Sequence, residues 1–170
     1  MHWPTCALRS TRRIGQLSRY MADQGVRMAF HHHMGTVVER ATEVDRLMEG
    51  TPDTVGLLYD TGHLTFAGDD PAQVARKWAR RINHVHAKDV RPDVLARVHK
   101  ERLSFLDAVV EGVYTVPGDG CVDFSEVGRF LRQSGYRGWA VVEAEQDPAK
   151  ATPKVYAAKA FDYVKNLLVS

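Results

Sequence analysis

Cysteine is scarce in this sequence, and long apolar runs are missing from it. The two cysteines, Cys6 and Cys121, lie far apart and form no CxxC pair. Sparse cysteine is typical of proteins from a reducing compartment, so we expect a cytoplasmic location. No apolar stretch reaches the roughly 18 residues that a membrane span needs, and the residues after Met1 do not resemble a secretory leader. We therefore expect no association with a membrane.

The sequence also has no excess of charge of one sign. Its 23 lysines and arginines stand against 21 acidic residues, which gives a formal net charge of +2 over 170 residues. The densest basic cluster, RKWARR, is typical of the solvated face of a helix. Because a nucleic-acid surface needs a basic patch, we expect no nucleic-acid partner. The chain is long enough for one domain with a core of its own.

The apolar residues alternate between strand-like runs and helical spacing. Short apolar runs predict strands over residues 26–30, 54–60, 82–90 and 138–145. Helical spacing predicts helices over residues 14–25, 42–50, 71–81, 123–135 and 148–170, with Thr42 as an N-cap and Pro71 in a first turn. The segment up to Cys121 that follows the third strand is expected to be rich in loops. Strands that alternate with helices predict βαβ units and a parallel sheet.

Ionisable side chains gather at the C-terminal end of every predicted strand. In chain order they are His31, His32 and His33; Asp60 and His63; His84, His86, Lys88 and Asp89; and Glu143 and Glu145. In parallel α/β folds the ligand binds beyond these strand ends, so we expect one common site. Because side chains alternate along a strand, we expect His31 and His33 to face this site and His32 to point away.

A mixture of imidazoles and carboxylates suits divalent ions such as Mn²⁺, Co²⁺, Fe²⁺ or Zn²⁺. No thiolate joins the set, which disfavours a structural zinc site. Each motif has a simpler explanation by itself: HVH can be an ordinary strand, DTGH a turn with an Asx-type cap, and HHH a surface patch. Their conjunction at the ends of successive strands predicts a metal site.

Five segments together resemble the inosose dehydratase family of xylose-isomerase-like (β/α)8 barrels: HHHMGTVVE, VGLLYDTGHLTFAG, INHVHAKD, PGDGCVDF and GWAVVEAEQDP. The resemblance covers about residues 25–164. It implies that Asp60, His86 and Glu143 bind a divalent metal, Mn²⁺ or Co²⁺. His31 stands where many members have a glutamate ligand, and His33 is the alternative.

The same resemblance implies a lyase that removes water from a keto-polyol such as inosose through an enediolate. Glu145, His63 and His33 are then the candidate acids and bases, and Lys88 would stabilise negative charge on oxygen. One alternative is a sugar isomerase or epimerase of the same superfamily, which would return the proton without expelling water. A non-catalytic half-barrel is another. An endonuclease relative is disfavoured by the lack of a basic, aromatic-rich stretch.

The length of the chain fits only part of such a barrel. A (β/α)8 domain needs about 250 residues, and the four predicted strands correspond to the C-terminal half, strands five to eight. We therefore expect residues 1–170 to form a partial TIM-barrel domain. Because natural proteins avoid unpaired strand edges, we also expect self-association or a partner that supplies the N-terminal half.

Overall fold

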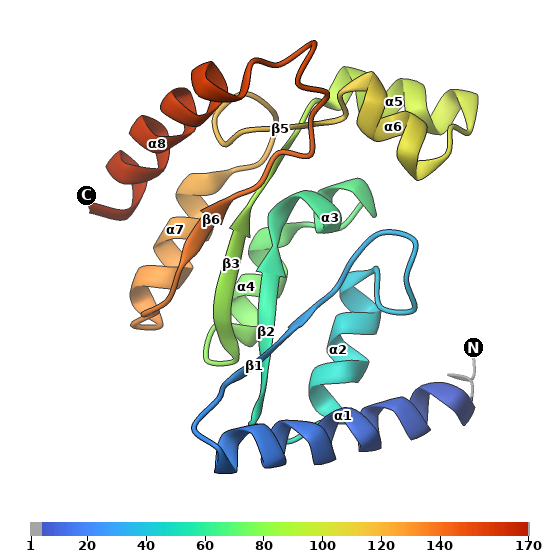
Figure 1. Cartoon of the computed structure of the whole chain (residues 1–170), viewed down its shortest axis with the longest axis vertical. Helices are drawn as coiled ribbons and strands as arrows, with labels where there is room; N and C mark the ends of the chain where they lie inside the picture. The colour runs from blue at the N-terminus through green and yellow to red at the C-terminus, as the bar shows by residue number, and fades with distance from the viewer. Residues whose placement is uncertain (1–4, 170) are drawn as a thin grey trace.

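The computed structural model describes residues 5–169, with side chains from residue 10 to residue 167, so the side chain of Cys6 lies outside the description. Its centre is a parallel sheet of four strands in the order β1-β2-β3-β6 (Figure 1). The strands are β1 (Met28–His31), β2 (Val55–Asp60), β3 (Ile82–Ala87) and β6 (Ala140–Val142). The predicted parallel α/β sheet is confirmed, although the first and last strands are shorter than expected.

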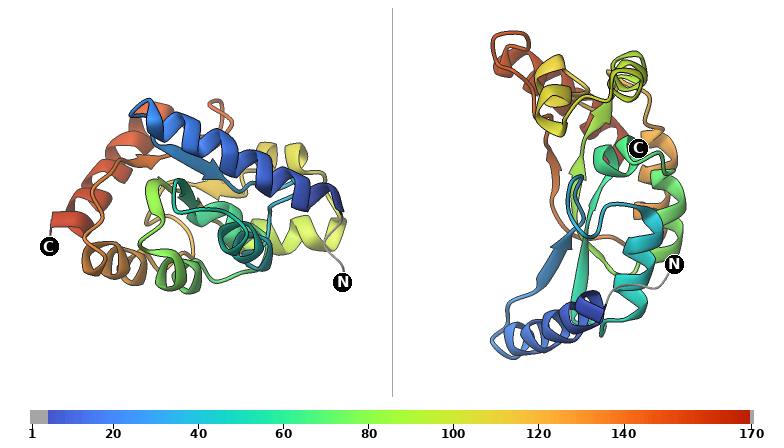
Figure 2. Two further views of the ribbon diagram at one scale, coloured as in Figure 1. Left: turned by 90° about the horizontal axis from the view of Figure 1, so that it is seen from below. Right: turned by 90° about the vertical axis from the view of Figure 1, so that its right-hand side faces the viewer.

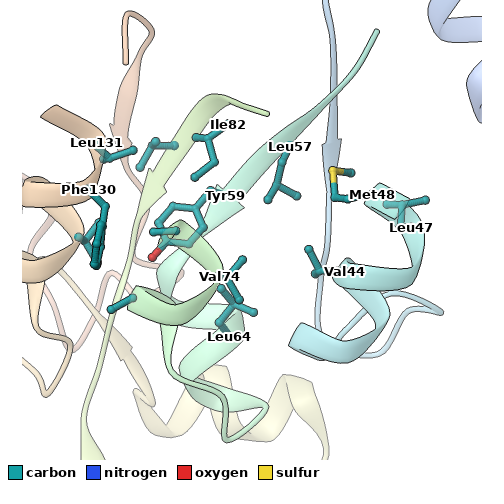
Figure 3. Packing of buried hydrophobic residues seen from close by; sticks show 14 of the residues in the cluster. Val44, Leu47, Met48, Leu57, Tyr59, Leu64, Val74, Ile82, Phe130 and Leu131 are labelled. Carbon is teal, nitrogen blue, oxygen red and sulfur yellow. The ribbon is translucent and has the colours of Figure 1, made fainter. Parts of the chain in front are cut away.

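Three helices cover one face of this sheet: α2 (Ala41–Glu49), α4 (Pro71–Trp78) and α7 (Phe124–Gln133), on the right in the second view of Figure 2. Leu57 and Tyr59 of β2 point into the core between the sheet and these helices (Figure 3). Because side chains alternate along a strand, Leu58 and Asp60 point to the opposite face. The site residues therefore lie on the face that these helices leave free.

The free face stays partly open. Ala29 is exposed, Val141 is 38% exposed, and Leu58 and His84 are half-buried. Within the described residues, β1 and β6 each pair with a strand on one side only. The helix α1 (Thr5–Asp23) packs against β1 and β2, while α8 (Pro153–Val169) packs against α7 and β6. The sheet is thus an open one with two edges.

The prediction of a loop-rich segment before Cys121 was wrong. This segment forms β4 (Asp89–Val90), α5 (Pro92–Glu101), α6 (Phe105–Glu111) and β5 (Tyr114–Thr115), and β4 pairs with β5 in an antiparallel manner. Its apolar residues pack in a small cluster of their own, around Val98, Ala108 and Val113. Each of these elements is short and offers only a few apolar residues to that cluster. The apolar pattern therefore repeats too few times along the sequence to be recognised as helix or strand.

Two helix starts also differ from the prediction. A short helix, α3 (Thr61–Phe66), which was not predicted, follows β2 directly. The Asx-type cap that DTGH allows is present, because the Asp60 side chain accepts hydrogen bonds from the amides of Gly62 and His63 in the first turn of this helix. Thr42 is not an N-cap: α2 begins after Arg40, and its first amide, that of Ala41, donates to the distant Asp69. The sequence could not reveal a cap supplied from another segment.

Pro71 occupies the first turn of α4, as predicted, and Asp70 caps that helix. None of the helices that the structure describes is long and apolar enough to cross a membrane.

Candidate metal centre

The C-terminal ends of the four parallel strands bring the predicted site residues together around Asp60. Its Oδ2 atom lies 3.4 Å from His31 Nε2, 3.3 Å from His86 Nδ1 and 3.5 Å from Lys88 Nζ. Burial by itself would raise the pKa of this fully buried carboxyl, but the two imidazoles and then Lys88 hold its pKa well below the usual range. Asp60 is therefore an anion at the centre of the cluster.

His86 and Glu143 face each other beside Asp60. His86 Nδ1 and Glu143 Oε2 lie 2.9 Å apart as an ion pair, although within the described residues neither atom makes a hydrogen bond of good geometry. The carboxylates of Asp60 and then Glu143 raise the pKa of His86 to about 9. His86 in turn lowers the pKa of Glu143 to about 2, with a further contribution from Lys88. An imidazole nitrogen and a carboxylate oxygen that lie this close to each other and to Asp60 can bind a shared cation.

Three overlapping groups of side chains could hold a metal ion. They are Asp60, His86 and Glu143; His31, Asp60 and His63; and His33, His63 and Glu145. Within each group the ligand atoms lie within 4.8 Å of one another. His31, and not His33, is the histidine of the run that shares a group with Asp60. The residues present therefore fit a divalent ion held by imidazoles and carboxylates.

His31 and His33 point toward the site and His32 points away from it, as strand alternation predicts. The ring of His33 lies 3.7 Å from that of His63, on the site side. His32 is fully buried on the opposite side, where its Nε2 accepts a hydrogen bond from the Asp60 amide at 3.2 Å. Burial lowers the pKa of His32 to about 4. His84, two residues before His86 on the same strand, makes an edge-to-face contact with it at 5.4 Å between ring centres and belongs to none of the three groups.

Lys88 is a fully buried cation within this cluster. Its Nζ lies 2.8 Å from both Glu143 Oε2 and Glu145 Oε2. Burial by itself would lower the pKa of Lys88, but Asp60 and the two glutamates outweigh burial and raise it. A Cβ atom on Gly62 would lie 2.5 Å from Lys88 Cγ. The glycine of the DTGH motif therefore makes room for the lysine stem.

Two aromatic residues that we did not predict, Tyr114 and Phe105, also lie in the site. Tyr114 is fully buried, and its hydroxyl lies 3.0 Å from His63 Nδ1. The ring of Phe105 lies 5.4 Å from that of His33 and 6.1 Å from that of His63. Both residues come from the segment predicted as loops. The one available signal was the short apolar run around Tyr114, which is compatible with a strand.

Asp89 turns away from the three groups. Its carboxylate accepts backbone hydrogen bonds from Gly118 and Gly120 at 3.0 Å and from Val122 at 2.9 Å. Asp89 thereby fixes the loop between β5 and α7, in which Gly118 adopts a positive φ of 85°.

Comparison with known proteins agrees with the fold. The model of a family described as a xylose isomerase-like TIM barrel matches residues 4–167. The chain is 50% identical to an inosose dehydratase of Clostridium beijerinckii over 153 residues, which is 89% of this chain and 51% of that protein. It is 56% identical to the rhizopine catabolism protein MocC of Rhizobium meliloti over 146 residues, 86% of this chain and 45% of that protein. The chain thus spans about half the length of the curated relatives it matches.

Among solved structures, the chain is similar to the IOLI protein described with a bound zinc atom. The TM-score is 0.69 at 18% identity, and the match covers 94% of this chain and 55% of that one. At this identity the similarity establishes the fold alone.

Proposed function

Because the chain belongs to the xylose isomerase-like TIM barrel family, we propose that its site is part of a metal-dependent hydro-lyase acting on a cyclic keto-polyol, inosose. The observation that carries this proposal is the group formed by the buried Asp60 with His86 and Glu143, whose ligand atoms lie within 4.8 Å of one another. The high identity to an inosose dehydratase supports the choice of substrate. A cytoplasmic location stays a prediction from the scarce cysteines.

His31, Asp60, His86 and Glu143 would hold the metal, and Mn²⁺ or Co²⁺ suits this donor set. When bound, such an ion acts as a Lewis acid toward the carbonyl oxygen and a neighbouring hydroxyl of the substrate. The IOLI protein, which has a similar fold, is described with a bound zinc atom, and this is compatible with a metal in a protein of this fold.

The remaining side chains would move the protons. Glu145, with 28% of its side chain exposed, would take the proton from the carbon next to the carbonyl. The half-buried His33 would protonate the hydroxyl on the following carbon, which leaves as water while a carbon–carbon double bond forms. Lys88 would donate a hydrogen bond to the substrate oxygen that gains negative charge. His63 Nε2 lies 3.1 Å from Lys88 Nζ and 3.9 Å from Glu145 Oε2, so His63 would support these two residues.

A chimera tests the proposal in a complete barrel, because a relative supplies the part that this chain does not match. In it, this chain replaces the matched part of the Clostridium beijerinckii inosose dehydratase. We expect the chimera to convert inosose to the dione with Mn²⁺ or Co²⁺, as followed by the absorbance of the product. We expect Asp60→Asn to abolish both activity and metal retention, because it removes the central charge while keeping an oxygen that can cap α3.

The matched control is Asp123→Asn, which changes a helix-capping aspartate of α7 outside the site. It should leave metal content and activity unchanged. A chimera that isomerises or epimerises the keto-polyol without releasing water would favour the isomerase alternative. A chimera that holds metal and turns over none of these substrates would favour a non-catalytic role.

A further inference from the structure

The third strand of the parallel sheet, β3, does not alternate regularly between the two faces. Ile82, which is labelled in Figure 3, and Val85 both belong to the core cluster between the sheet and the helices. In a regular strand, two residues that are three positions apart point to opposite faces, because side chains alternate with a period of two. One residue between Ile82 and Val85 must therefore stand outside the alternation.

The pairing of β3 with β2 identifies Asn83 as this residue. Ile82 is paired with one residue of β2 and His84 with the next, so Asn83 lies between the two pairs. Two residues of one strand that face one residue of its neighbour form a β-bulge. Beyond the bulge, His86 lies opposite Asp60. A regular strand continued from Ile82 would place His86 one position beyond Asp60 and turn it toward the helices.

The side chain of Asn83 joins three strands. Its Nδ2 donates a hydrogen bond at 2.8 Å to the carbonyl of Met28 in β1, and the amide crosses Gly56 of β2 to reach it. A Cβ atom on Gly56 would lie 2.0 Å from Asn83 Nδ2, and the three atoms nearest to it all belong to the Asn83 amide group. Gly56 does not have a positive φ, so its backbone conformation does not require glycine. Glycine is needed at this position because the Asn83 amide occupies the space.

The strands that Asn83 joins carry the two imidazoles on either side of Asp60. His31 lies three residues after Met28 in β1, and His86 lies three residues after Asn83 in β3. Their ring centres are 4.9 Å apart, and each ring has a nitrogen within 3.4 Å of Asp60 Oδ2. Within the described residues β1 pairs with β2 alone, so the Asn83 hydrogen bond links β1 directly to β3.

We propose that Asn83 is a positioning residue of the metal centre and that Gly56 makes room for it. The bulge turns His86 toward Asp60, and the hydrogen bond to β1 keeps His31 at the distance from His86 at which both imidazoles can bind one ion. The binding of an ion rests on the proposed function, whereas the positions of the two rings can be measured without one.

The first variant, Asn83→Ala in the intact chain, removes the amide and with it the hydrogen bond to β1. We expect the nuclear Overhauser effect between the ring protons of His31 and His86 to weaken in the metal-free chain, because the two strands are no longer linked. We expect the affinity for Mn²⁺, measured by calorimetry, to fall about tenfold, as is common when a residue that orients a ligand is lost.

The matched control is Tyr59→Phe. It also removes one hydrogen bond from a side chain of the sheet to a backbone carbonyl, that from the Tyr59 hydroxyl to Pro71 at 2.8 Å, but on the helix-covered face. Both variants should lower the melting temperature by about 2–4 °C, since each loses one hydrogen bond. Only Asn83→Ala should change the Overhauser effect and the Mn²⁺ affinity.

A second variant, Gly56→Ala, tests the space that the amide occupies. By itself this substitution places a methyl group against the Asn83 amide, so we expect the melting temperature to fall by about 5–10 °C and Mn²⁺ to bind more weakly. In the Asn83→Ala background the obstructing atoms are gone. The same substitution should then lower the melting temperature by less than about 2 °C, because the two sites are directly coupled.

An Overhauser effect in Asn83→Ala as strong as in the natural sequence would overturn the proposal, as would an equal loss of that effect in Tyr59→Phe. Equal cost of Gly56→Ala in the two backgrounds would show that the glycine does not serve Asn83. A natural chain that binds no Mn²⁺ in the complete barrel of the chimera would contradict the proposed function. The Overhauser effects would still decide whether Asn83 positions the two rings.

Discussion

The two carboxylate oxygens of Asp60 face different partners. Oδ1 accepts the amides of Gly62 and His63 at 2.9 and 3.0 Å and so begins α3, while Oδ2 faces His31, His86 and Lys88. The backbone thus fixes the orientation of the carboxylate before any ligand arrives. At the scale of single residues, this pre-organisation explains how a fully buried carboxylate can serve as the centre of a cation site.

Substitutions in the histidine run should separate metal binding from stability. We expect His31→Ala to weaken binding of Mn²⁺ at least about tenfold, because it removes a donor beside Asp60. We expect His32→Ala to leave metal affinity nearly unchanged but to destabilise the fold by about 1–3 kcal/mol, since it empties a buried position. His33→Ala should weaken substrate binding more than metal binding. Calorimetric titration and thermal unfolding measure these effects, and the reverse order of His31 and His32 would contradict the observed register.

Metal binding should depend on pH through His86. Its pKa is raised to about 9 by Asp60 and Glu143, so at neutral pH the ring holds a proton that a metal must displace. The apparent affinity for Mn²⁺ should therefore rise by about tenfold for each unit of pH between 7 and 9, and should level off above the pKa. Titrations in buffers of different ionisation enthalpy should detect release of about one proton at pH 7. Affinity that does not change over this interval would exclude His86 as a ligand.

At the scale of elements, β2 is followed by a helix with no intervening loop, and β3 continues through Lys88 into β4. Gly62 at the start of α3 and Lys88 after β3 pack directly on each other. Asp89 fixes the loop between β5 and α7, because its carboxylate accepts hydrogen bonds from three amides of that loop. These connections keep the charged residues at the strand ends in fixed positions, since the carboxylates of Asp60 and Asp89 accept hydrogen bonds from the amides of the segments that follow.

Asp89→Ala tests the importance of the loop. It would leave the amides of Gly118, Gly120 and Val122 without their acceptor, so we expect the free energy of unfolding to fall by about 3 kcal/mol. Hydrogen exchange of these three amides should accelerate more than exchange in the core strands. The control Asp123→Ala removes an exposed cap of α7 and should destabilise by only about 1 kcal/mol. Equal losses in the two variants would mean that the loop is not fixed by Asp89.

At the scale of the whole molecule, the sheet is curved, open and covered on one side only (Figure 2). The free face carries apolar residues below the charged cluster, among them Ala29, Leu58 and Val141. In a closed (β/α)8 barrel such residues fill the interior in layers of four, drawn from alternate strands. The four strands supply part of such layers. Within residues 5–169, no further strand pairs with the outer edge of β1 or of β6.

We propose that the isolated chain associates through this face and these edges, since exposed edges and apolar patches favour association. Analytical ultracentrifugation should find dimers or larger species, and Val141→Asp should shift them toward monomer by placing a charge on the free face. The control Val155→Asp changes a residue of α8 whose side chain is 63% exposed. This variant should associate as the natural sequence does. We also expect little dehydratase activity from the isolated chain. A monomer with full turnover would contradict both expectations.

The sequence by itself determined the local features of this protein. Strand alternation correctly placed His31 and His33 on one face and His32 on the other, because the period of two depends only on neighbouring residues. The order of strands and helices predicted a parallel sheet, and the strand ends predicted where Asp60, His86 and Glu143 would meet. Each of these inferences uses short stretches of chain whose geometry is nearly independent of the remainder.

Only the tertiary structure decided which groups touch. The Lys88–Glu145 contact joins residues 57 positions apart, and the Tyr114–His63 contact joins residues 51 positions apart. No local pattern encodes such distances, since they depend on how separate elements pack. The same holds for the raised pKa of Lys88, because burial and the surrounding carboxylates act in opposite directions and only the packed arrangement determines which is stronger.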